Sequence, residues 1–477
     1  MSFQESKEMY NPINEDIEED TPEQAENKKR KVAGIVTLSL MTIVLLISLF
    51  ESSIISDSIS YTGDCYTGCC TWEGMDFCPG DCITQGYDDE YYCPASVEER
   101  VMKIYDITSE DAICNDGTQG RLHYRPSLPG DNENKWLFRF EGGNLCFDTN
   151  TCDQRADDDP AFMTAATSPI IYQDPEGGMF DGNPDEEEGN YYYHDWNAVH
   201  THYCTSDAWS GTSFADDNEV GINFVGYHHV FGSFEEALLR FNLAEATEVT
   251  INGYSAGCFG TIMMSDQIFE WFNTNLPGVP VHFKCDSGWF LASADYLGDM
   301  DGSSQSMTEL AEQMKIAWEN WKPMVSDTCL NAVGDYTCTI PEYNWEYLAN
   351  TDNIFLQENT FDSMQQSLHL GNGEFTEAET DEYFEYLANQ TITSLLTHGV
   401  NFQSSNCGNH DSTNRQWMYE ITVDNMLLHE RYENFRNGER LIQDYDEWID
   451  YDEDGNKVLL KDANPTCPIT VPPPHID

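Results

Sequence analysis

The sequence EVTINGYSAG at residues 248–257 indicates a short β-branched strand that runs into a sharp turn. Residues 258–272 follow with apolar side chains at helical spacing. Ser255 is therefore expected on the bend between strand and helix, with its hydroxyl exposed. Gly253 and Gly257 flank it and have no Cβ, which lets the two backbones approach closely. The G-x-S-x-G pattern alone also arises by chance in a chain with 33 glycines, but the strand and helix around it favour a nucleophile.

Other apolar stretches extend this pattern into an α/β fold. Strand-like and helix-like segments alternate along the chain, which is typical of a mainly parallel sheet covered by helices. The strands are predicted at 135–140, 247–252 and 354–357, and the helices at 233–244 and 306–321. The acidic, glycine-rich segment 174–190 is expected on the surface, and no internal repeat is visible.

An uncharged, Leu-, Ile- and Val-rich run covers residues 32–50. Its 19 residues nearly match the roughly 30 Å of a bilayer's hydrocarbon core. Lys28-Lys29-Arg30-Lys31 precede the run directly and no basic residue follows until Arg100, so the amino end is expected to stay cytosolic. A cleaved signal sequence is the alternative, with cleavage in the Ser-rich residues 52–60. Both interpretations place the bulk of the chain in the secretory pathway.

These features divide the 477 residues into five predicted parts, and the 40% hydrophobic content suffices for one large domain. They make the chain a single-pass type II membrane protein with a lumenal or extracellular domain. The parts are an acidic cytosolic tail (1–31), a transmembrane signal anchor (32–50), a Cys-rich stem or insertion (51–100), an α/β domain (101–464) and a Pro-rich terminus (465–477).

All sixteen cysteines lie between Cys65 and Cys467, on the side predicted to be outside the cytosol. Oxidised pairs are expected there. Six of the sixteen crowd into residues 65–93 with too few apolar neighbours for a core, which indicates a disulfide-stapled stem. Zinc is the competing explanation, but no second CxxC or His pair follows. The sequon at Asn389 fits a glycosylated lumenal domain.

The net charge of −63 limits the classes of partner. Nine of the acidic and five of the basic residues lie in the tail, which leaves 76 acidic and 17 basic residues, a net charge of about −59, beyond it. A surface this negative repels a phosphate backbone, so nucleic acid is excluded, and polyanionic substrates meet the same repulsion. A solvated acidic surface is the preferred interpretation. Residues 450–455 copy half of a calcium loop, but Lys461 occupies the position of the closing Glu, so a turn is expected and calcium binding by the acidic loops stays open.

A serine nucleophile needs a histidine to take its proton and an acid to orient that histidine. In one arrangement of such sites the acid and then the histidine follow the serine on loops after later strands. His410 lies in a polar loop 155 residues beyond Ser255, and Asp362 follows the predicted strand 354–357. Composition alone does not single out Asp362 among so many acids.

Several motifs together resemble the pectin acetylesterase and Notum family of carboxylesterases over about residues 112–415. They occur in the family's order: AICNDG (112–117), FEGGNLCF (140–147) with Cys152, DWN (195–197), YCTSDAWSG (203–211), the turn at Ser255 and DSGWF (286–290). The resemblance implies an α/β-hydrolase fold. It also implies that Ser255 is the nucleophile, Asp362 the acid and His410 the base.

The resemblance further implies an oxyanion hole built from backbone N–H groups of Gly143, Asn144 and Ala256. Cys146 and Cys152, six residues apart, are candidates for a disulfide that braces this turn. Relatives carry Trp at one of the two positions before that cysteine, whereas this chain has Asn144 and Leu145, so an aromatic wall of the pocket is missing. Trp289 and Phe290 either replace part of that wall or are ordinary core residues.

No cofactor and no metal site are expected. The pairs His200/His202 and His228/His229 lack a carboxylate at a spacing that completes a site, so they are interpreted as structural.

The expected activity is that of a serine carboxylesterase acting on O-acetyl groups of an extracellular or cell-wall polysaccharide. Two alternatives stay open: a Notum-like removal of a fatty acyl group from a protein, and an inactive hydrolase-like ectodomain that binds a glycan or protein. The acyl group, the disulfide connectivity, the oligomeric state and the membrane concerned do not follow from the sequence.

Overall fold

The computed structural model describes most of the chain from residue 101 onward. It covers residues 101–168, 178–184, 190–292, 306–365, 377–413, 415–439 and 464–467, together with short strands at 70–72, 75–77, 83–84, 91–92, 171–172, 444–445, 449–451 and 457–459. The predicted cytosolic tail and the predicted membrane segment 32–50 lie outside these residues, as does most of the Cys-rich stem. Of the helices within the described ranges, none combines the length and the apolar composition that crossing a bilayer requires.

The chain divides into two compact units, residues 1–77 and 78–477. The described part of the first unit is an antiparallel pair, β1 (Cys70–Trp72) with β2 (Met75–Phe77). The second unit holds all of the elements discussed below. It begins with another short antiparallel pair, β3 (Ile83–Thr84) with β4 (Tyr91–Tyr92).

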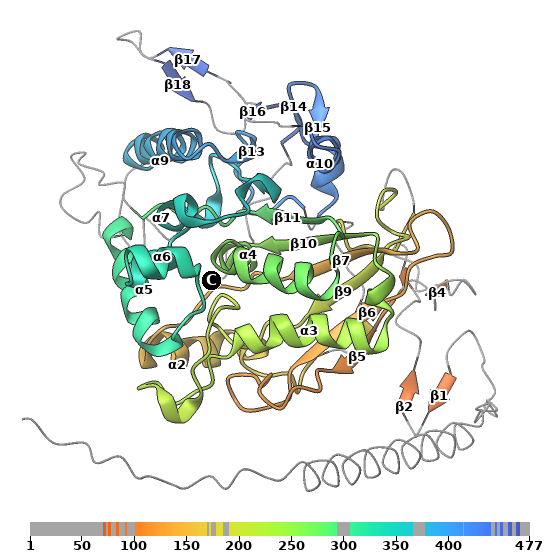
Figure 1. The fold of residues 1–477 in the computed structure, drawn as a ribbon. Helices are drawn as coiled ribbons and strands as arrows, with labels where there is room; N and C mark the ends of the chain where they lie inside the picture. Colours follow the sequence, from red (N-terminus) through yellow and green to blue (C-terminus); the bar gives the residue numbers. More distant parts are fainter. Residues whose placement is uncertain are drawn as a thin grey trace, which may run out of the picture. The chain divides into compact units, whose positions relative to one another are not determined.

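A ten-stranded sheet forms the centre of the second unit (Figure 1). Its order is β16-β13-β12-β11-β10-β7-β9-β6-β5-β8. Every pairing from β16 to β9 is parallel, and the pairings of β9 with β6, β6 with β5 and β5 with β8 are antiparallel. The strands are β5 (Met102–Asp106), β6 (Arg121–Arg125), β7 (Lys135–Phe140), β8 (Ile171–Tyr172), β9 (Asn197–Thr201), β10 (Glu248–Tyr254), β11 (Val281–Asp286), β12 (Ile354–Gln357), β13 (Asn401–Ser404) and β16 (Asp444–Tyr445). The predicted α/β class with a mainly parallel sheet is confirmed.

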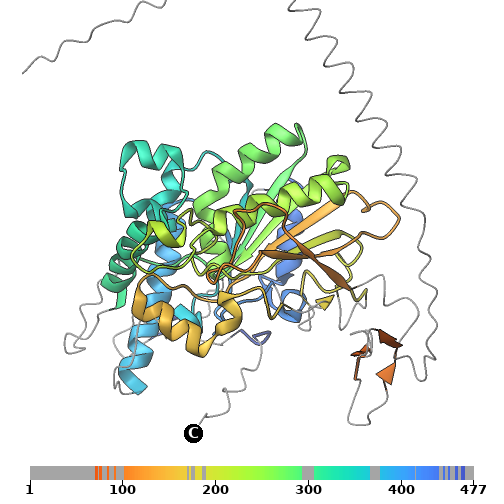
Figure 2. The same ribbon diagram turned by 90° about the horizontal axis from the view of Figure 1, so that it is seen from below.

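Helices cover both faces of this sheet (Figure 2). The α-helices are α2 (Thr149–Asp158), α3 (Gly226–Arg240), α4 (Ala256–Asn275), α5 (Ser306–Trp321), α6 (Asp327–Ala332), α7 (Pro341–Asn344), α9 (Glu377–Thr397) and α10 (Leu428–Arg436). Short 3-10 turns lie at η2 (Pro160–Met163), η3 (Ala215–Asp217), η4 (Leu243–Glu245), η5 (Tyr336–Thr339), η6 (Trp345–Tyr347), η7 (Thr351–Asn353) and η8 (Gln416–Tyr419).

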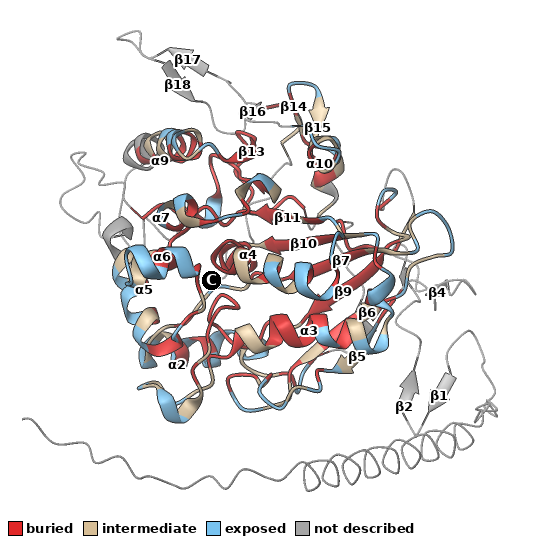
Figure 3. Cartoon of the chain, in the orientation of Figure 1, coloured by how far each residue is buried: buried red, intermediate tan, exposed pale blue. Residues whose placement is uncertain are grey.

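The side chains of each strand alternate between the two faces of the sheet, and this divides the core into two apolar layers. In β7, Phe138 packs into the larger cluster with α3 and α4, whereas the next residue toward the amino end, Leu137, packs into a second cluster with α10. Successive side chains of a strand point to opposite faces, so a strand covered on both sides buries the side chains of both faces. Figure 3 shows the central strands buried accordingly. This arrangement explains why 135–140 was recognisable as a buried strand.

The predicted strands and helices are observed, but both ends of one predicted helix are wrong. The strands predicted at 135–140, 247–252 and 354–357 are β7, β10 and β12, and the helix predicted at 306–321 is α5. The helix predicted at 233–244 instead begins at Gly226 and ends at Arg240. Its first turns contain two glycines and two histidines, whose weak helix propensity is overridden by the burial of Val230 and Phe231.

The segment 174–190 is expected on the surface, and this expectation is wrong for its described residues. Met179 and Phe180 are fully buried in the second apolar cluster. The buried Asn190 side chain donates hydrogen bonds to the carbonyls of Met179 and Asp181, and Arg125 donates to the carbonyl of Phe180. Two apolar residues with satisfied backbone groups outweigh the acidic composition of their neighbours.

Two short hairpins lie near the carboxyl end. The 3-10 turn η8 is followed by the hairpin of β14 (Thr422–Val423) and β15 (Met426–Leu427). The acidic segment 450–455 begins in β17 (Ile449–Tyr451), which pairs with β18 (Lys457–Leu459), and residues 452–456 lie outside the described ranges. The turn predicted there stays a prediction.

Four disulfides lie in the described part of the second unit. The predicted Cys146–Cys152 pair is confirmed. The others are Cys114–Cys204, Cys329–Cys338 and Cys407–Cys467. Cys467 thereby ties the first residues of the Pro-rich terminus to the domain. The general expectation of oxidised pairs is wrong for Cys258 and Cys285, which are buried thiols of α4 and β11.

Candidate active site

Ser255 occupies a strained turn between β10 and α4. Its backbone has φ 52° and ψ −124°, a conformation that a residue with a Cβ rarely adopts. A Cβ at Gly257 would lie 1.9 Å from the carbonyl oxygen of Phe140, and a Cβ at Gly142 would lie 2.7 Å from the Cβ of Ser255. Glycine at both positions lets the end of β7 pack directly against the turn. The predicted bend at Ser255 is therefore present, but the residue is buried, at 8% exposure, whereas an exposed hydroxyl was expected.

Asp362 and His410 come from the loops that follow β12 and β13. These strands lie two and three places from β10 in the sheet, and all are parallel, so their carboxyl ends meet at one edge. Nδ1 of His410 lies 2.7 Å from Oδ2 and 2.8 Å from Oδ1 of Asp362. Oδ1 also accepts hydrogen bonds from the backbone N–H groups of Met364 and Gln365. The carboxylate is therefore fixed in place, and it orients the imidazole.

The two loops are also bound to one another away from this contact. The N–H of Ser363 donates to the carbonyl of Gly408, and the N–H of Thr360 donates to the carbonyl of Ser405. The side-chain amide of Asn359 donates to the carbonyl of Asn409 at 2.8 Å. These bonds hold Asp362 and His410 together independently of their own hydrogen bond.

Nε2 of His410 is the nitrogen left for Ser255. With Nδ1–H donated to Asp362, the neutral imidazole carries its lone pair on Nε2. Nε2 is buried and has no hydrogen-bond partner among the residues that the structure describes, so the bond to the Ser255 hydroxyl is not formed. Such bonds commonly tighten only when substrate is bound. The structure thus brings Asp362 and His410 into contact and leaves the link between His410 and Ser255 open.

Electrostatics at His410 favour the protonated imidazole. Burial alone would lower its pKa, but the charge of Asp362 and the hydrogen bond to it raise the pKa to about 9, with smaller contributions from Asp411 and Glu358. Glu358 is fully buried, and burial raises the pKa of its carboxyl well above the ordinary value. Repulsion from Asp362 raises this pKa further. This environment therefore favours the neutral form of the Glu358 carboxyl.

The predicted oxyanion-hole residues lie at the end of β7 and the start of α4. Gly143 and Asn144 both have positive φ, 126° and 64°. The side-chain oxygen of Asn144 accepts the N–H of Leu145 at 2.8 Å, which stabilises this turn. The N–H groups of Gly143, Asn144 and Ala256 have no acceptor within the described part of the chain. They are thus available to an incoming anion, and the Cys146–Cys152 disulfide follows the turn directly.

The two aromatic residues proposed as a replacement pocket wall differ in their surroundings. Trp289 is fully buried, donates its indole N–H to Ser394 and packs against Trp345, so it is a core residue. Phe290 is 9% exposed and packs against Phe259. A different aromatic residue lies at the oxyanion turn, because the ring of Phe162 packs against Gly143.

The histidine pairs have structural partners that sequence spacing did not show. His200 and His202, from β9 and the residues after it, contact the carboxylate of Glu141 at 3.5 and 3.6 Å. Although burial opposes ionisation, interactions with His200 and His202 lower the pKa of Glu141 to about 2. Burial in turn lowers the pKa of His200 well below its ordinary value. His229 lies beside the sulfurs of Cys114 and Cys204, but both sulfurs are held in a disulfide and are not metal ligands in that state.

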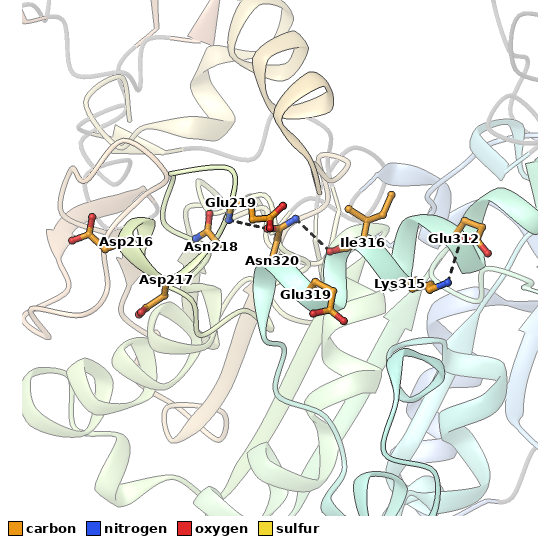
Figure 4. A pocket seen from close by; sticks show the side chains of 9 residues that line it. All are labelled: Asp216, Asp217, Asn218, Glu219, Glu312, Lys315, Ile316, Glu319 and Asn320. Carbon is orange, nitrogen blue, oxygen red and sulfur yellow. Dashed lines mark hydrogen bonds and ion pairs between the residues drawn. The ribbon is translucent and has the colours of Figure 1, made fainter.

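A separate surface pocket of about 800 Å³ lies between η3 and α5 and contains none of the predicted catalytic residues (Figure 4). Its lining includes five acidic side chains and Lys315, which pairs with Glu312. Asn320 closes the base by accepting from the N–H of Glu219 and donating to the carbonyl of Ile316. These acids agree with the expected solvated acidic surface.

Sequence reasoning missed three buried polar residues at the end of β11: Lys284, Asp286 and Ser287. All three are fully buried, and Asp286 and Ser287 contact the loop that carries His410. The available signal was a lysine and an aspartate two residues apart in a strand whose other residues, except His282, are apolar, because buried charges require partners.

Asn389, the predicted glycosylation site, is exposed on α9. Glycosylation itself stays a prediction.

Comparisons with known proteins agree with the motifs. A family model described as pectinacetylesterase matches residues 95–419. A palmitoleoyl-protein carboxylesterase NOTUM from Schmidtea mediterranea is 27% identical over 349 residues, which cover 70% of this chain and 63% of that relative. The chain therefore matches less than two thirds of that relative's length. Palmitoleoyl-protein carboxylesterase notum1' from Xenopus laevis is 25% identical over 400 residues, covering 79% of this chain and 76% of the relative.

A solved structure has the same fold. The Wnt deacylase Notum from Drosophila superposes with a TM-score of 0.64 at 23% identity, over 77% of this chain and all of the solved chain. At this identity the similarity concerns the fold alone.

Proposed function

The chain belongs to the pectinacetylesterase family, and on this premise we propose that it is a serine carboxylesterase that uses Ser255, His410 and Asp362. The Ser255 hydroxyl attacks the carbonyl carbon of an O-acyl ester while Nε2 of His410 takes its proton. Asp362 holds the imidazole and stabilises its positive charge. The backbone N–H groups of Gly143, Asn144 and Ala256 stabilise the oxyanion of the tetrahedral intermediate.

The intermediate then collapses and the acyl–oxygen bond of the ester breaks. His410 returns its proton to the departing alcohol, which leaves an acyl group on Ser255. In the second half, His410 takes a proton from water and the hydroxide attacks the acyl carbon. The bond from that carbon to Oγ of Ser255 then breaks, His410 returns the proton to Oγ, and the carboxylic acid leaves. Neither half of the reaction requires a cofactor.

One observation carries this proposal most directly, namely the hydrogen bond between His410 and Asp362 beside a strained serine turn. The backbone strain at Ser255 agrees with a nucleophile, because such strain is concentrated at functional sites. An inactive ectodomain that only binds a glycan or protein would not need an imidazole held by a carboxylate together with a strained serine turn.

A fluorophosphonate probe on the folded ectodomain tests the chemistry. We expect labelling of the wild-type protein, loss of labelling in Ser255→Ala and unchanged labelling in Ser265→Ala, a buried serine within α4. Equal labelling of the wild type and Ser255→Ala would refute the serine mechanism. Absence of labelling in all folded variants would favour the binding ectodomain.

We propose a fatty acyl ester of a protein as the first substrate class. The relatives that match most of this chain are named palmitoleoyl-protein carboxylesterases, and this supports removal of a long acyl group. The family's name supports the alternative, an O-acetyl group of a polysaccharide. An acetylated neutral glycan would not be repelled by the acidic surface, whereas a polyanionic one would be.

Two nitrophenyl esters of different chain length distinguish these classes. We expect a higher kcat/KM on the octanoate than on the acetate ester. The opposite ratio would refute the fatty acyl proposal and support the acetylesterase, while Ser255→Ala should be inactive on both esters.

We propose that residues 32–50 anchor the chain and that its domain is lumenal or extracellular. The uncharged run and the basic residues before it support this orientation. In intact microsomes, protease should spare the domain, and glycosidase treatment of the recovered protein should remove a glycan from Asn389. Digestion of the domain without detergent would refute the orientation.

A further inference from the structure

The end of β11 lies between the serine turn and the histidine loop. The carbonyl oxygen of Asp286 accepts the N–H of Ser255 at 2.8 Å. Its carboxylate oxygen Oδ2 accepts the N–H groups of Ser412 and Thr413 at 2.8 and 2.6 Å. One buried residue therefore binds both the nucleophile's backbone and the backbone just beyond His410.

Ser287 adds a third point of attachment. Its hydroxyl donates to the carbonyl oxygen of His410 and lies 3.0 Å from Oδ1 of Asp286. Its backbone N–H donates to the carbonyl of Gln357, the last residue of β12. Its φ of 53° bends the chain back at this position. The Asp286–Ser287 pair thereby contacts the segments that carry all three proposed catalytic residues.

A buried lysine completes the arrangement. Lys284 lies two residues before Asp286 on the same face of β11, and its ammonium donates to the hydroxyl of Thr413 at 2.6 Å. Burial lowers the pKa of Lys284 to about 8, and the charge of Asp286 opposes this shift. Burying the Lys284 ammonium and the Asp286 carboxylate costs desolvation free energy, which a pair of apolar side chains would not cost. Packing alone therefore does not explain their presence.

We propose that Asp286, together with Ser287, is a positioning residue that places the imidazole of His410 relative to Ser255. The inference deepens the proposed function and rests on it. Asp362 fixes Nδ1, but Nε2 has no hydrogen bond to Ser255 in this state. The distance between base and nucleophile is therefore set by the backbone of the histidine loop. That backbone is held at residues 410, 412 and 413 by the Asp286–Ser287 pair.

Asp286→Asn tests this role. An amide oxygen in the place of Oδ2 accepts the two N–H groups more weakly than a carboxylate does, and the amide NH2 then takes the place of Oδ1 beside the Ser287 hydroxyl, so the loop is held less firmly. We expect kcat on a nitrophenyl ester to fall about 100-fold, the effect of misplacing a catalytic group by about 1 Å, with little change in KM. In the wild type, kcat/KM should rise with pH as His410 loses its proton. This rise should flatten in the variant, because a displaced imidazole no longer takes the proton of Ser255.

Asp207→Asn is the matched control. Asp207 is also fully buried and also accepts two backbone N–H groups, from Gly226 and Trp209, and one hydroxyl, from Thr205. It makes no hydrogen bond to the described residues of the loops that carry Asp362 and His410. We expect it to lower the melting temperature as Asp286→Asn does, while kcat and the pH profile stay as in the wild type.

Ser287→Ala tests the same positioning role if Asp286→Asn does not fold. It removes only the hydroxyl bond to His410, so we expect a folded protein with kcat reduced about 10-fold and unchanged KM, roughly the free energy of one hydrogen bond. Wild-type kcat and a wild-type pH profile in the folded variants would overturn the inference. Equal losses of kcat in Asp207→Asn and Asp286→Asn would also overturn it, because the effect would then be general destabilisation. Activity that survives Ser255→Ala would instead refute the proposed function itself.

Discussion

The imidazole of His410 and the carboxylate of Asp362 form a close pair, with Nδ1 only 2.7 Å from Oδ2, although 48 residues separate them in the chain. The pair is held by two loops with hydrogen bonds of their own, so it persists when either side chain is altered conservatively.

Asp362→Asn should therefore inactivate the enzyme without unfolding it. The amide can donate a hydrogen bond to Nδ1, which selects the tautomer with the proton on Nε2 and removes the base. We expect a decrease of kcat by roughly 10⁴-fold. Steady-state kinetics measures it, and circular dichroism serves as the control for folding. Retention of more than about a tenth of the activity would contradict the role of Asp362.

The pH dependence follows from the raised pKa of His410. The base must be neutral, and its pKa is about 9, so kcat/KM should rise as the pH rises through about 9. In the folded state this pKa lies above the ordinary value of 6.5, so the contact stabilises the protein fully below pH 6.5 and is lost as the pH rises through about 9. Rates from about pH 6 to about pH 10 test the first expectation. A plateau that begins near neutral pH would contradict it.

Asn144 should act through its backbone. Its positive φ costs a residue with a Cβ roughly 1–2 kcal/mol, which asparagine offsets through its bond to Leu145. Asn144→Ala should misalign the oxyanion donors and lower kcat about 10-fold. Asn144→Gly, which tolerates the conformation, should retain more activity. Equal kcat values for the two variants would exclude this conformational role.

Gly257→Ala should destabilise the protein strongly. The added Cβ would lie 1.9 Å from the backbone carbonyl of Phe140, which cannot move without shifting β7. Overpacking of this kind costs about 1–3 kcal/mol or more. The control is Gly232→Ala in α3, where the Cβ would lie 2.6 Å from the Cγ2 methyl of Ile107 and in ordinary contact with Ala112 and Ser109, so it would meet side chains and no backbone atom. Chemical denaturation compares the two, and an equal or smaller loss for Gly257→Ala would contradict the close approach.

The disulfides should differ in their contribution to stability. Cys407–Cys467 closes a loop of 60 residues, whereas Cys146–Cys152 closes a loop of 6. Loop-closure entropy therefore predicts that Cys407–Cys467 contributes about 2 kcal/mol more to the free energy of unfolding. Double alanine variants of each pair, compared by chemical denaturation, test this difference. Cys407 also precedes His410 by three residues, so its loss should lower kcat as well. A larger stability loss for the Cys146–Cys152 variant would contradict the entropic argument.

Local features were accessible to sequence reasoning because neighbouring residues determine them. The buried strand at β7, the helix α5 and the turn at Ser255 each follow from side-chain periodicity within about 20 residues. The site residues Asp362 and His410 required the family resemblance in addition, since the chain contains 85 acidic residues and 12 histidines.

Contacts between distant segments were decided by the tertiary structure. The sequence by itself determined the α/β class and the serine turn. Only the order of the parallel strands places Asp286 between Ser255 and the His410 loop, and only the pairing of β7 with β9 places Glu141 beside His200. The physical reason is that periodicity records which side of an element is buried, whereas strand order decides which buried polar groups meet.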